Sequence, residues 1–426
     1  MTNDERMTKL EFRKTRLRGE AAFVLGISFV ILHYSFRILP PAAQLLYATS
    51  ARLGGSGLDA VAAETVRVAQ RAGVLRRAIA FENRLDDLPA AQFESLRWNP
   101  VRLLSALGSE HYYAAKKHAL DRTAAKRLAE GEFTLFHGWS GECVRTLREA
   151  RRRGIPSLIE IPTWHRNKGK AKPARLTKSE RERAAATGWR GMKNRLLITR
   201  QQMLEEYDLA DLILVLSEKA EETFLAAGIA KEKLFRHQRG VDVERFRPAE
   251  KPPEKFVALF VGALIKRKGV HHLIDVWKRL ALKDAELWLA GTVHDEIKPL
   301  LGKPGDDGIH AMGFAEKVED FYRTGVVHVF PSECEGSAKC TYEAAASGLA
   351  QITTREAGDV VLDGVNGLII PPNNPDALAE ALLRLYRDRE LCAKLGAAGR
   401  QRVVEKFTWE HFGTRLREAW QAASAR

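Results

Sequence analysis

Two glutamates, Glu335 and Glu343, follow a short apolar run over residues 326–331, and their types and spacing suit chemistry. Side chains eight positions apart on one continuous helix do not share a face. The carboxylates therefore converge only if Glu335 lies in a loop and Glu343 lies in the helix behind it. The backbone amides of residues 339–341 would then open that helix and point at an anion. A carboxylate can stabilise a developing positive charge, and the amides of the helix start beside it can stabilise a negative charge that develops at the same time.

A basic turn, Lys266-Arg267-Lys268, follows another apolar run that ends at Gly262. A helix is expected from about Val270, directly after Gly269. A lysine in such a turn can reach phosphate oxygens as a point charge, and the helix dipole assists it. A solvated basic turn is the alternative, but the glycines that bracket the charges favour an anion-binding loop.

Two loops in the first half of the chain carry weaker signals. Gly54 and Gly55 stand between an expected strand and a helix, where glycines let the backbone approach an anion. A flexible turn is equally consistent, because the full Gly-x-Gly-x-x-Gly pattern is missing. His165 follows the expected strand 157–162 and could donate a hydrogen bond to a sugar hydroxyl or to developing negative charge. Taken alone, His165 and the similarly placed His137 are as consistent with structural roles.

The elements that must position these loops alternate between short apolar runs and amphipathic stretches, which is typical of βαβ units and parallel sheets. Each half of the chain predicts its own doubly wound sheet, and ligands bind such sheets beyond the carboxyl ends of the strands. The polar, proline-rich residues 247–254 form the expected linker. The expected strands are 45–50, 75–81, 134–137, 157–162 and 211–217, then 256–262, 286–291, 326–331, 351–354 and 368–370.

Length and composition agree with a two-domain globular protein. The 426 residues exceed one ordinary core, and 45% hydrophobic with 29% charged residues excludes collagen-like, disordered and polytopic membrane chains. The four cysteines include no Cys-x-x-Cys pair, so neither a disulfide framework nor a zinc site is predicted. This cysteine usage fits a reducing compartment.

The net charge of +14 is concentrated in two segments. Residues 166–200 hold twelve Lys and Arg against two Glu, a net of +10, and residues 1–19 hold six basic against three acidic residues, a net of +3. The remaining residues carry only +1, so a basic nucleic-acid-binding face on the scaffold is not expected. The insertion 166–200 is interpreted either as a solvated loop or as a recognition element for an anionic acceptor or membrane surface.

Residues 1–40 form an N-terminal extension, basic at first and then apolar over residues 21–32. This apolar run is shorter than the roughly 20 residues that cross a bilayer, and no small-residue cleavage site follows it. Three interpretations stay open. The extension is an interfacial helix on a membrane, a packed extension, or upstream sequence outside the folded protein.

The basic turn and the two-glutamate loop, together with residues 363–372 and 407–409, resemble the C-terminal half of glycosyltransferase family 4. These enzymes are retaining nucleotide-sugar transferases with a GT-B architecture, in which two Rossmann-like doubly wound parallel sheets face a cleft. The resemblance extends over residues 43–420. It implies an N-terminal acceptor-side domain over 41–250, a C-terminal donor domain over 251–407, and a helix over 408–426 that crosses back to the first domain.

The resemblance also implies roles for individual residues. Glu343 would hold the ribose hydroxyls, Glu335 would lie beside the donor sugar, and Lys268 would contact the diphosphate. His165 matches the histidine that reaches toward the sugar, so Glu335, His165 and Lys268 are the catalytic candidates. The donor-binding candidates are Glu343, Lys268, Arg267, Gly262, Lys339, Cys340, Thr341, Gly54 and Gly55.

Two positions depart from the family pattern. Family members often carry arginine directly after the glycine of the basic turn, where this chain has Ala263. The diphosphate then lacks one fork of donors, which Lys266, Arg267 or Lys339 could replace. Ala338 stands where glycine is more usual.

The function expected from this resemblance is transfer of a hexose from a UDP- or GDP-linked donor to an acceptor hydroxyl. The acceptor would be a carbohydrate or a lipid-linked carbohydrate in envelope or extracellular polysaccharide assembly. No metal, no further cofactor and no nucleic acid are expected. The cytoplasm is the expected location, with peripheral contact at the inner membrane face through the extension and the insertion.

Two other functions remain open at this stage. A nucleotide-sugar epimerase or a phosphorylase on the same scaffold would share the phosphate-binding loops. A binding protein without catalysis would use the basic insertion to hold an acidic polymer or nucleic acid.

Overall fold

The computed structural model describes residues 43–55, 57–97, 109–166, 181–182, 185–188, 191, 194, 197–251, 253–302 and 307–426. The extension 1–40 and most of the basic insertion, on which several expectations above depend, lie outside the described residues. The described residues belong to one compact unit with two parallel sheets. Within them, no helix combines the length and the apolar character needed to cross a bilayer.

The first sheet has the strand order β3-β2-β1-β4-β5-β6-β7, and its strand pairs are parallel. The order reverses direction between β1 and β4, which places a topological switch point at the carboxyl ends of these two strands. The strands are β1 (Leu45–Ala48), β2 (Leu75–Ala80), β3 (Phe93–Ser95), β4 (Leu135–Trp139), β5 (Ser157–Glu160), β6 (Leu212–Val215) and β7 (Leu234–Arg236).

Alternating residues of this sheet enter two different cores because successive strand side chains point to opposite faces. Leu45 and Tyr47 of β1 pack with α2 and α14, whereas Leu46 and Ala48 pack with α3 and α4. A strand that is buried on both faces is apolar throughout, which is why these runs are recognisable. The helices of this lobe are α2 (Leu58–Arg71), α3 (Ser109–Glu130), α4 (Val144–Arg153), α7 (Arg200–Leu209) and α8 (Glu218–Ala226), and α14 (Trp409–Ser424) joins them.

The second sheet repeats the same winding, with the order β10-β9-β8-β11-β12-β13 and parallel pairs. Its faces are covered by α9 and α12 on one side and by α10, α11 and α13 on the other. The strands are β8 (Phe256–Val261), β9 (Ala285–Ala290), β10 (Ile309–Gly313), β11 (Val327–Phe330), β12 (Ala350–Thr353) and β13 (Leu368–Ile369). The helices are α9 (Val270–Leu280), α10 (Val318–Arg323), α11 (Lys339–Ala346), α12 (Pro375–Arg387) and α13 (Arg389–Lys406).

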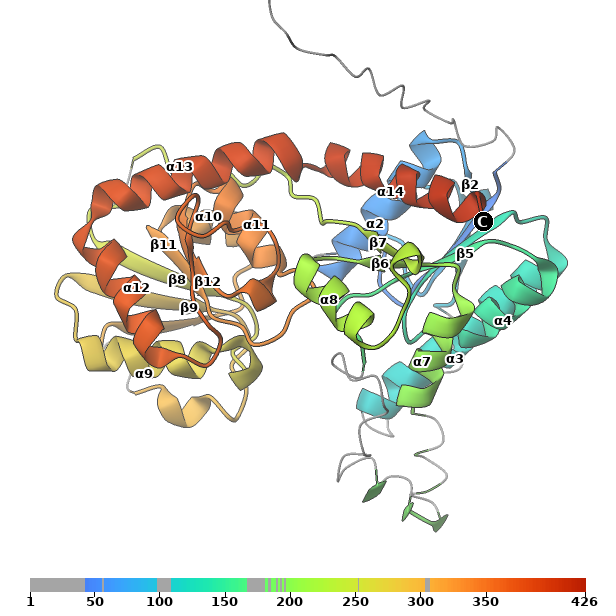
Figure 1. Cartoon of the computed structure of the whole chain (residues 1–426), viewed down its shortest axis with the longest axis horizontal. Coiled ribbons are helices and arrows are strands. Elements are labelled where there is room, and N and C mark those ends of the chain that lie inside the picture. The colour runs from blue at the N-terminus through green and yellow to red at the C-terminus, as the bar shows by residue number, and fades with distance from the viewer. Residues whose placement is uncertain are drawn as a thin grey trace, which may run out of the picture. The chain divides into compact units, whose positions relative to one another are not determined.

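The chain crosses between the sheets twice. The first crossing runs from β7 to β8, and the second lies between α13 and α14, which follow one another across the two lobes (Figure 1). The crossings touch, because Val241 pairs with Thr408 and an added Cβ at Gly240 would lie 2.4 Å from the Trp409 ring. Phe412, Leu416 and Trp420 then bury α14 in the core of the first lobe. The fold class expected from the sequence, two Rossmann-like parallel-sheet domains, is confirmed.

Candidate active site

One cavity of about 610 Å³ lies among loops of both lobes, and its size is typical of small-ligand sites. The first lobe and the crossing segment contribute Gly57, Leu58, Pro162, Thr163, Arg239, Arg245 and Phe246. The second lobe contributes the loops that follow β8, β9, β10 and β11 and the first turn of α11. Among these residues are Gly262, Ala263, Lys268, Thr292, Glu316, Glu335, Ser337, Ala338, Lys339, Cys340 and Glu343.

Glu335 and Lys268 meet in this cavity. The Lys268 Nζ atom lies 3.7 Å from Glu335 Oε1, and the Arg267 Nη1 atom lies 3.2 Å from the same oxygen. The Ser332 hydroxyl approaches this oxygen at 3.4 Å. Lys268 Nζ also lies 5.2 Å from the centroid of the Phe330 ring, a cation–π distance. The loops after β8 and β11 thus bring a carboxylate and two cations together at the carboxyl ends of adjacent strands.

Glu343 lines the same cavity from the first turns of α11. Its carboxylate accepts a hydrogen bond from the Tyr322 hydroxyl at 3.1 Å and pairs with Lys339 Nζ at 3.1 Å. The carboxylate is nearly buried, so both partners help to offset its desolvation. Burial and the neighbouring Glu343 charge raise the pKa of the Tyr322 hydroxyl, which keeps it a hydrogen-bond donor at neutral pH.

The basic turn is held in place by glycine geometry and by backbone contacts. Gly269 has φ +71°, and a Cβ there would lie 2.1 Å from the Pro331 carbonyl oxygen. The Glu333 N–H donates to the Arg267 carbonyl at 2.9 Å, which ties this turn to the two-glutamate loop. The sequence therefore places glycine where the two loops touch, and this contact positions Lys268 against Glu335.

The start of α11 differs in part from the expectation. Lys339 and Cys340 line the cavity, but the Thr341 N–H donates to the Ala338 carbonyl at 3.1 Å, and its side chain also bonds that carbonyl. The Thr341 amide is therefore engaged within the chain because the helix starts with a tight turn. Burial raises the pKa of the Cys340 thiol, so that side chain stays neutral.

The loops of the first lobe are placed differently from the expectation. His165 is not among the cavity residues, because its ring packs against Tyr207 and Phe224 with centroids 5.1 Å and 4.9 Å away. Its backbone N–H donates to the Thr223 hydroxyl at 3.0 Å, and burial lowers the pKa of its imidazole. The neighbouring Thr163 reaches the cavity instead.

Gly54 and Gly55 also stand back from the cavity, which Gly57 and Leu58 line. A Cβ at Gly55 would lie 2.5 Å from an oxygen of Asp59, and that carboxylate accepts the Arg52 N–H at 3.0 Å. Gly55 therefore serves the packing of the turn before α2. Arg267, a further donor-binding candidate, does not line the cavity and reaches it only through Glu335.

Two basic residues of the cavity were missed by sequence reasoning. Arg239 and Arg245 flank the Gly240-Val241-Asp242 stretch in the first crossing. Arg245 pairs with Glu319 at 2.8 Å, and Arg239 is nearly fully buried. The sequence predicts the linker over residues 247–254, and no local pattern shows that the preceding residues turn these side chains toward the second lobe.

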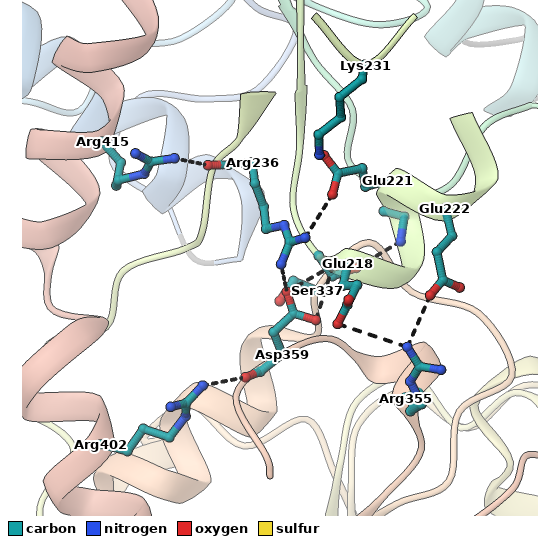
Figure 2. Close-up of polar contacts among 12 residues, drawn as sticks. Glu218, Glu221, Glu222, Lys231, Arg236, Ser337, Arg355, Asp359, Arg402 and Arg415 are labelled. Atoms are coloured by element: carbon teal, nitrogen blue, oxygen red, sulfur yellow. Dashed lines mark hydrogen bonds and ion pairs between the residues drawn. The ribbon is translucent and has the colours of Figure 1, made fainter. Parts of the chain in front are cut away.

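Polar contacts also join the lobes beside the cavity (Figure 2). Asp359, from the loop after β12, accepts the Glu218 N–H at 2.9 Å and so caps the N-terminus of α8. Arg355 pairs with Glu222 of the same helix at 3.1 Å. A helix of the first lobe is thus fixed to a loop of the second.

The second lobe matches a known family. Residues 255–388 match the model described as glycosyl transferases group 1. The C-terminal lobe is a group 1 glycosyltransferase domain. The resemblance to a glycosyltransferase family drawn from the two-glutamate loop and the basic turn is therefore confirmed. This group 1 domain contains Glu335, Glu343 and Lys268.

Relatives and solved structures extend the similarity beyond the group 1 domain. The capsular polysaccharide biosynthesis glycosyltransferase CapM of Staphylococcus aureus is 29% identical over 238 residues, covering 49% of this chain and 62% of CapM. The chain spans 48% to 62% of the lengths of four curated relatives.

Two solved structures show the fold of the whole described chain. Sucrose-phosphate synthase from Thermosynechococcus elongatus has a TM-score of 0.64 at 17% identity, covering 89% of this chain and 98% of that one. Anabaena HepE, solved in complex with UDP-glucose, has a TM-score of 0.58 at 15% identity, covering 88% and 98%. The group 1 domain and the lobe before it together form a GT-B fold.

Proposed function

We propose that this protein is a retaining glycosyltransferase of family 4 that moves a hexose from a UDP- or GDP-linked donor to an acceptor hydroxyl. The observation that carries the proposal is the meeting of Glu335 with Lys268, 3.7 Å apart, in a cavity that Glu343 also lines. These three side chains match the three parts of such a donor. Lys268 would contact the diphosphate, Glu335 would face the sugar, and Glu343 would bind the ribose.

The charges of this reaction suit that arrangement. When the bond between the anomeric carbon and the diphosphate oxygen breaks, its electron pair leaves with the diphosphate and the sugar becomes oxocarbenium-like. Lys268 would stabilise the departing diphosphate, and the Glu335 carboxylate would face the positive sugar. The acceptor oxygen then bonds the anomeric carbon, and its hydroxyl proton passes to an oxygen of the departing diphosphate as the glycosidic bond forms.

Glu343 is proposed to bind the ribose. A carboxylate accepts hydrogen bonds from the two vicinal hydroxyls, and Tyr322 and Lys339 hold it in place. The Lys339 ammonium, 3.1 Å from Glu343, would stand between ribose and diphosphate. The proposed chemistry uses the protein's own cations, Lys268 and Lys339, for the charge of the diphosphate.

The biological setting is proposed from the relatives. CapM is named for capsular polysaccharide biosynthesis, and HepE was solved with UDP-glucose. We infer a role in envelope or extracellular polysaccharide assembly with a carbohydrate or lipid-linked acceptor. Because nucleotide sugars are made in the cytosol, the catalytic lobes would work there, with peripheral contact at the inner membrane face.

Calorimetric titration of the whole chain with UDP, GDP and ADP, followed by incubation with the matching radiolabelled nucleotide sugars, tests the proposal. We expect saturable binding of one nucleoside diphosphate and transfer of label to a polysaccharide or lipid fraction, with retained anomeric configuration by NMR. Binding of none of the three at millimolar concentration would overturn the proposal. A product formed without an acceptor, or only with inorganic phosphate, would point to an epimerase or phosphorylase.

A further inference from the structure

Arg239 is a charged residue of the cavity that has no role in the reaction proposed above. It follows β7 in the first crossing, lines the cavity, and is only 4% exposed. Its Nε atom donates to the Ser337 carbonyl oxygen of the second lobe at 3.2 Å. Its Nη1 atom lies 3.9 Å from Glu160 Oε1, at the carboxyl end of β5. The guanidinium therefore stands between the two lobes, within the wall of the proposed donor site.

The polar groups of this pair are incompletely satisfied. Arg239 Nη1 has no hydrogen-bond acceptor, and Glu160 Oε2 has no donor, among the described residues. Burial raises the pKa of the Glu160 carboxyl, and the Arg239 charge opposes this shift. Leaving a buried guanidinium nitrogen without a hydrogen bond is costly, and a bound anion is one partner that would satisfy it.

The other basic side chains that line the described cavity have closer acidic partners. Lys339 pairs with Glu343 at 3.1 Å, Arg245 with Glu319 at 2.8 Å, and Lys268 with Glu335 at 3.7 Å. Among the described residues, Arg239 has the 3.9 Å contact with Glu160 and a hydrogen bond to a neutral carbonyl. Ala263 contributes no charge after Gly262, and no arginine of that turn is among the residues that line the described cavity.

We propose that Arg239 binds the diphosphate oxygens of the nucleotide-sugar donor and supplies, from the crossing segment, the guanidinium that Ala263 cannot supply. The assignment rests on the proposed function and adds a residue to the same site. The planar guanidinium offers parallel N–H donors that fit two phosphate oxygens, whereas an ammonium acts as a point charge. Ser337 holds Nε, so the Nη groups are oriented before the donor arrives.

The same contact would favour departure of the leaving group. The diphosphate gains negative charge as the glycosyl bond breaks, and a preorganised cation in a buried site stabilises that charge more than water does. Glu160 acts in the opposite sense because it competes with the phosphate for the same guanidinium. Removing the Glu160 charge therefore distinguishes a ligand-binding role of Arg239 from a purely structural ion pair.

The test measures the diphosphate contribution to affinity. Calorimetry compares UDP with uridine, and GDP with guanosine, on the full chain and on Arg239→Met, Arg239→Lys and Glu160→Gln variants. Arg384→Met, on the exposed face of α12, is the matched control. For Arg239→Met we expect the ratio of nucleoside Kd to nucleoside diphosphate Kd to fall about tenfold to a hundredfold, with unchanged nucleoside affinity. Arg239→Lys should lose part of this ratio, and Glu160→Gln should keep or increase it.

Several outcomes overturn the assignment. An unchanged ratio in Arg239→Met shows that the guanidinium does not contact the diphosphate. The ion pair of Arg239 with Glu160 is structural if Arg239→Met weakens the binding of nucleoside and of nucleoside diphosphate equally. It is also structural if Glu160→Gln lowers the ratio of the two Kd values as much as Arg239→Met does. If Arg239→Met does not fold, Arg239→Lys decides. An unchanged ratio of nucleoside Kd to nucleoside diphosphate Kd in that variant excludes a bidentate contact between the guanidinium and the diphosphate. If the unmodified chain binds no nucleoside diphosphate, the proposed function fails as well, so the two failures are distinguishable.

Discussion

At the residue scale, the two glutamates of the cavity have different surroundings and should have separable effects. Glu343 is held by Tyr322 and Lys339, whereas Glu335 faces Lys268 and Arg267. We expect Glu343→Gln to raise the Kd of the nucleoside diphosphate about tenfold or more, because charged hydrogen bonds to ribose hydroxyls are lost. Glu335→Gln should leave that Kd within about threefold and lower kcat about a hundredfold. Calorimetry and initial rates measure the two effects, and equal losses of binding alone would contradict the assigned roles.

Lys268 should affect turnover through the leaving group. Replacing it by Met keeps an unbranched side chain but removes the ammonium, which lies 5.2 Å from the Phe330 ring centroid and which we propose contacts the diphosphate. A charge-assisted contact contributes about 1.5 to 3 kcal/mol, so kcat should fall about tenfold to a hundredfold. Initial rates with donors whose leaving groups differ in basicity test whether Lys268 acts on the leaving group. If the variant slows all donors to the same extent, Lys268 acts only by positioning Glu335.

At the element scale, the close approach of the basic turn to the two-glutamate loop predicts an effect of Gly269. Gly269→Ala should lower the free energy of unfolding by well over 1 kcal/mol, because both left-handed backbone strain and overlap with the Pro331 carbonyl oppose the Cβ. Gly364 is a matched control. It has a similar φ of +68°, but an added Cβ there meets nothing within 4 Å. Gly364→Ala should therefore show the strain alone, about 1 kcal/mol, by urea titration. Equal losses in both variants would exclude the packing contribution.

The elements show what the sequence could and could not predict. Strands such as β1, β4, β8 and β11 are buried on both faces, so their continuous apolar runs were found. The strands β3, β7 and β10 were missed. The first two have three residues each, and β10 has only Ile309 buried, so their patterns are short or polar. Glu335, Glu343 and Lys268 converge because they follow adjacent strands of one sheet, which local patterns do predict.

At the scale of the whole molecule, the remaining site residues depend on how two lobes pack, and no local pattern specifies that packing. Gly336 shows how close this packing is, since an added Cβ would lie 2.3 Å from the Pro162 carbonyl oxygen of the other lobe. The same packing brings Arg239 to Ser337 and caps α8 with Asp359. The family resemblance implies that His165 reaches toward the sugar, whereas tertiary packing sets its ring against Tyr207 and Phe224 of the first lobe.

Two histidines that are buried beside α14, the helix that returns to the first lobe, make the folded protein sensitive to acid. His137 and His237 are fully buried near α14, where the Trp420 Nε1–H faces His137 Nδ1 at 3.4 Å and the Phe412 ring packs at a tilt against His237. Burial lowers the pKa of each imidazole to about 3, from an ordinary value near 6.5. The unfolded chain therefore binds more protons than the folded chain as the pH falls below about 6.5. The contribution of these two histidines to stability is fully present above that pH and is lost progressively toward pH 3.

We expect the free energy of unfolding to fall between pH 6.5 and 4 with a contribution of about 1 kcal/mol per pH unit from each histidine. Urea titrations across this range measure the slope. The single variants His137→Gln and His237→Gln should each reduce this slope by the equivalent of about one bound proton, because glutamine cannot take up a proton when the chain unfolds. In the second lobe, burial lowers the pKa of His328 to about 4, so His328→Gln should flatten the slope in the same direction. A slope that no histidine variant changes would mean that carboxylate protonation, and not exposure of buried imidazoles, governs acid unfolding.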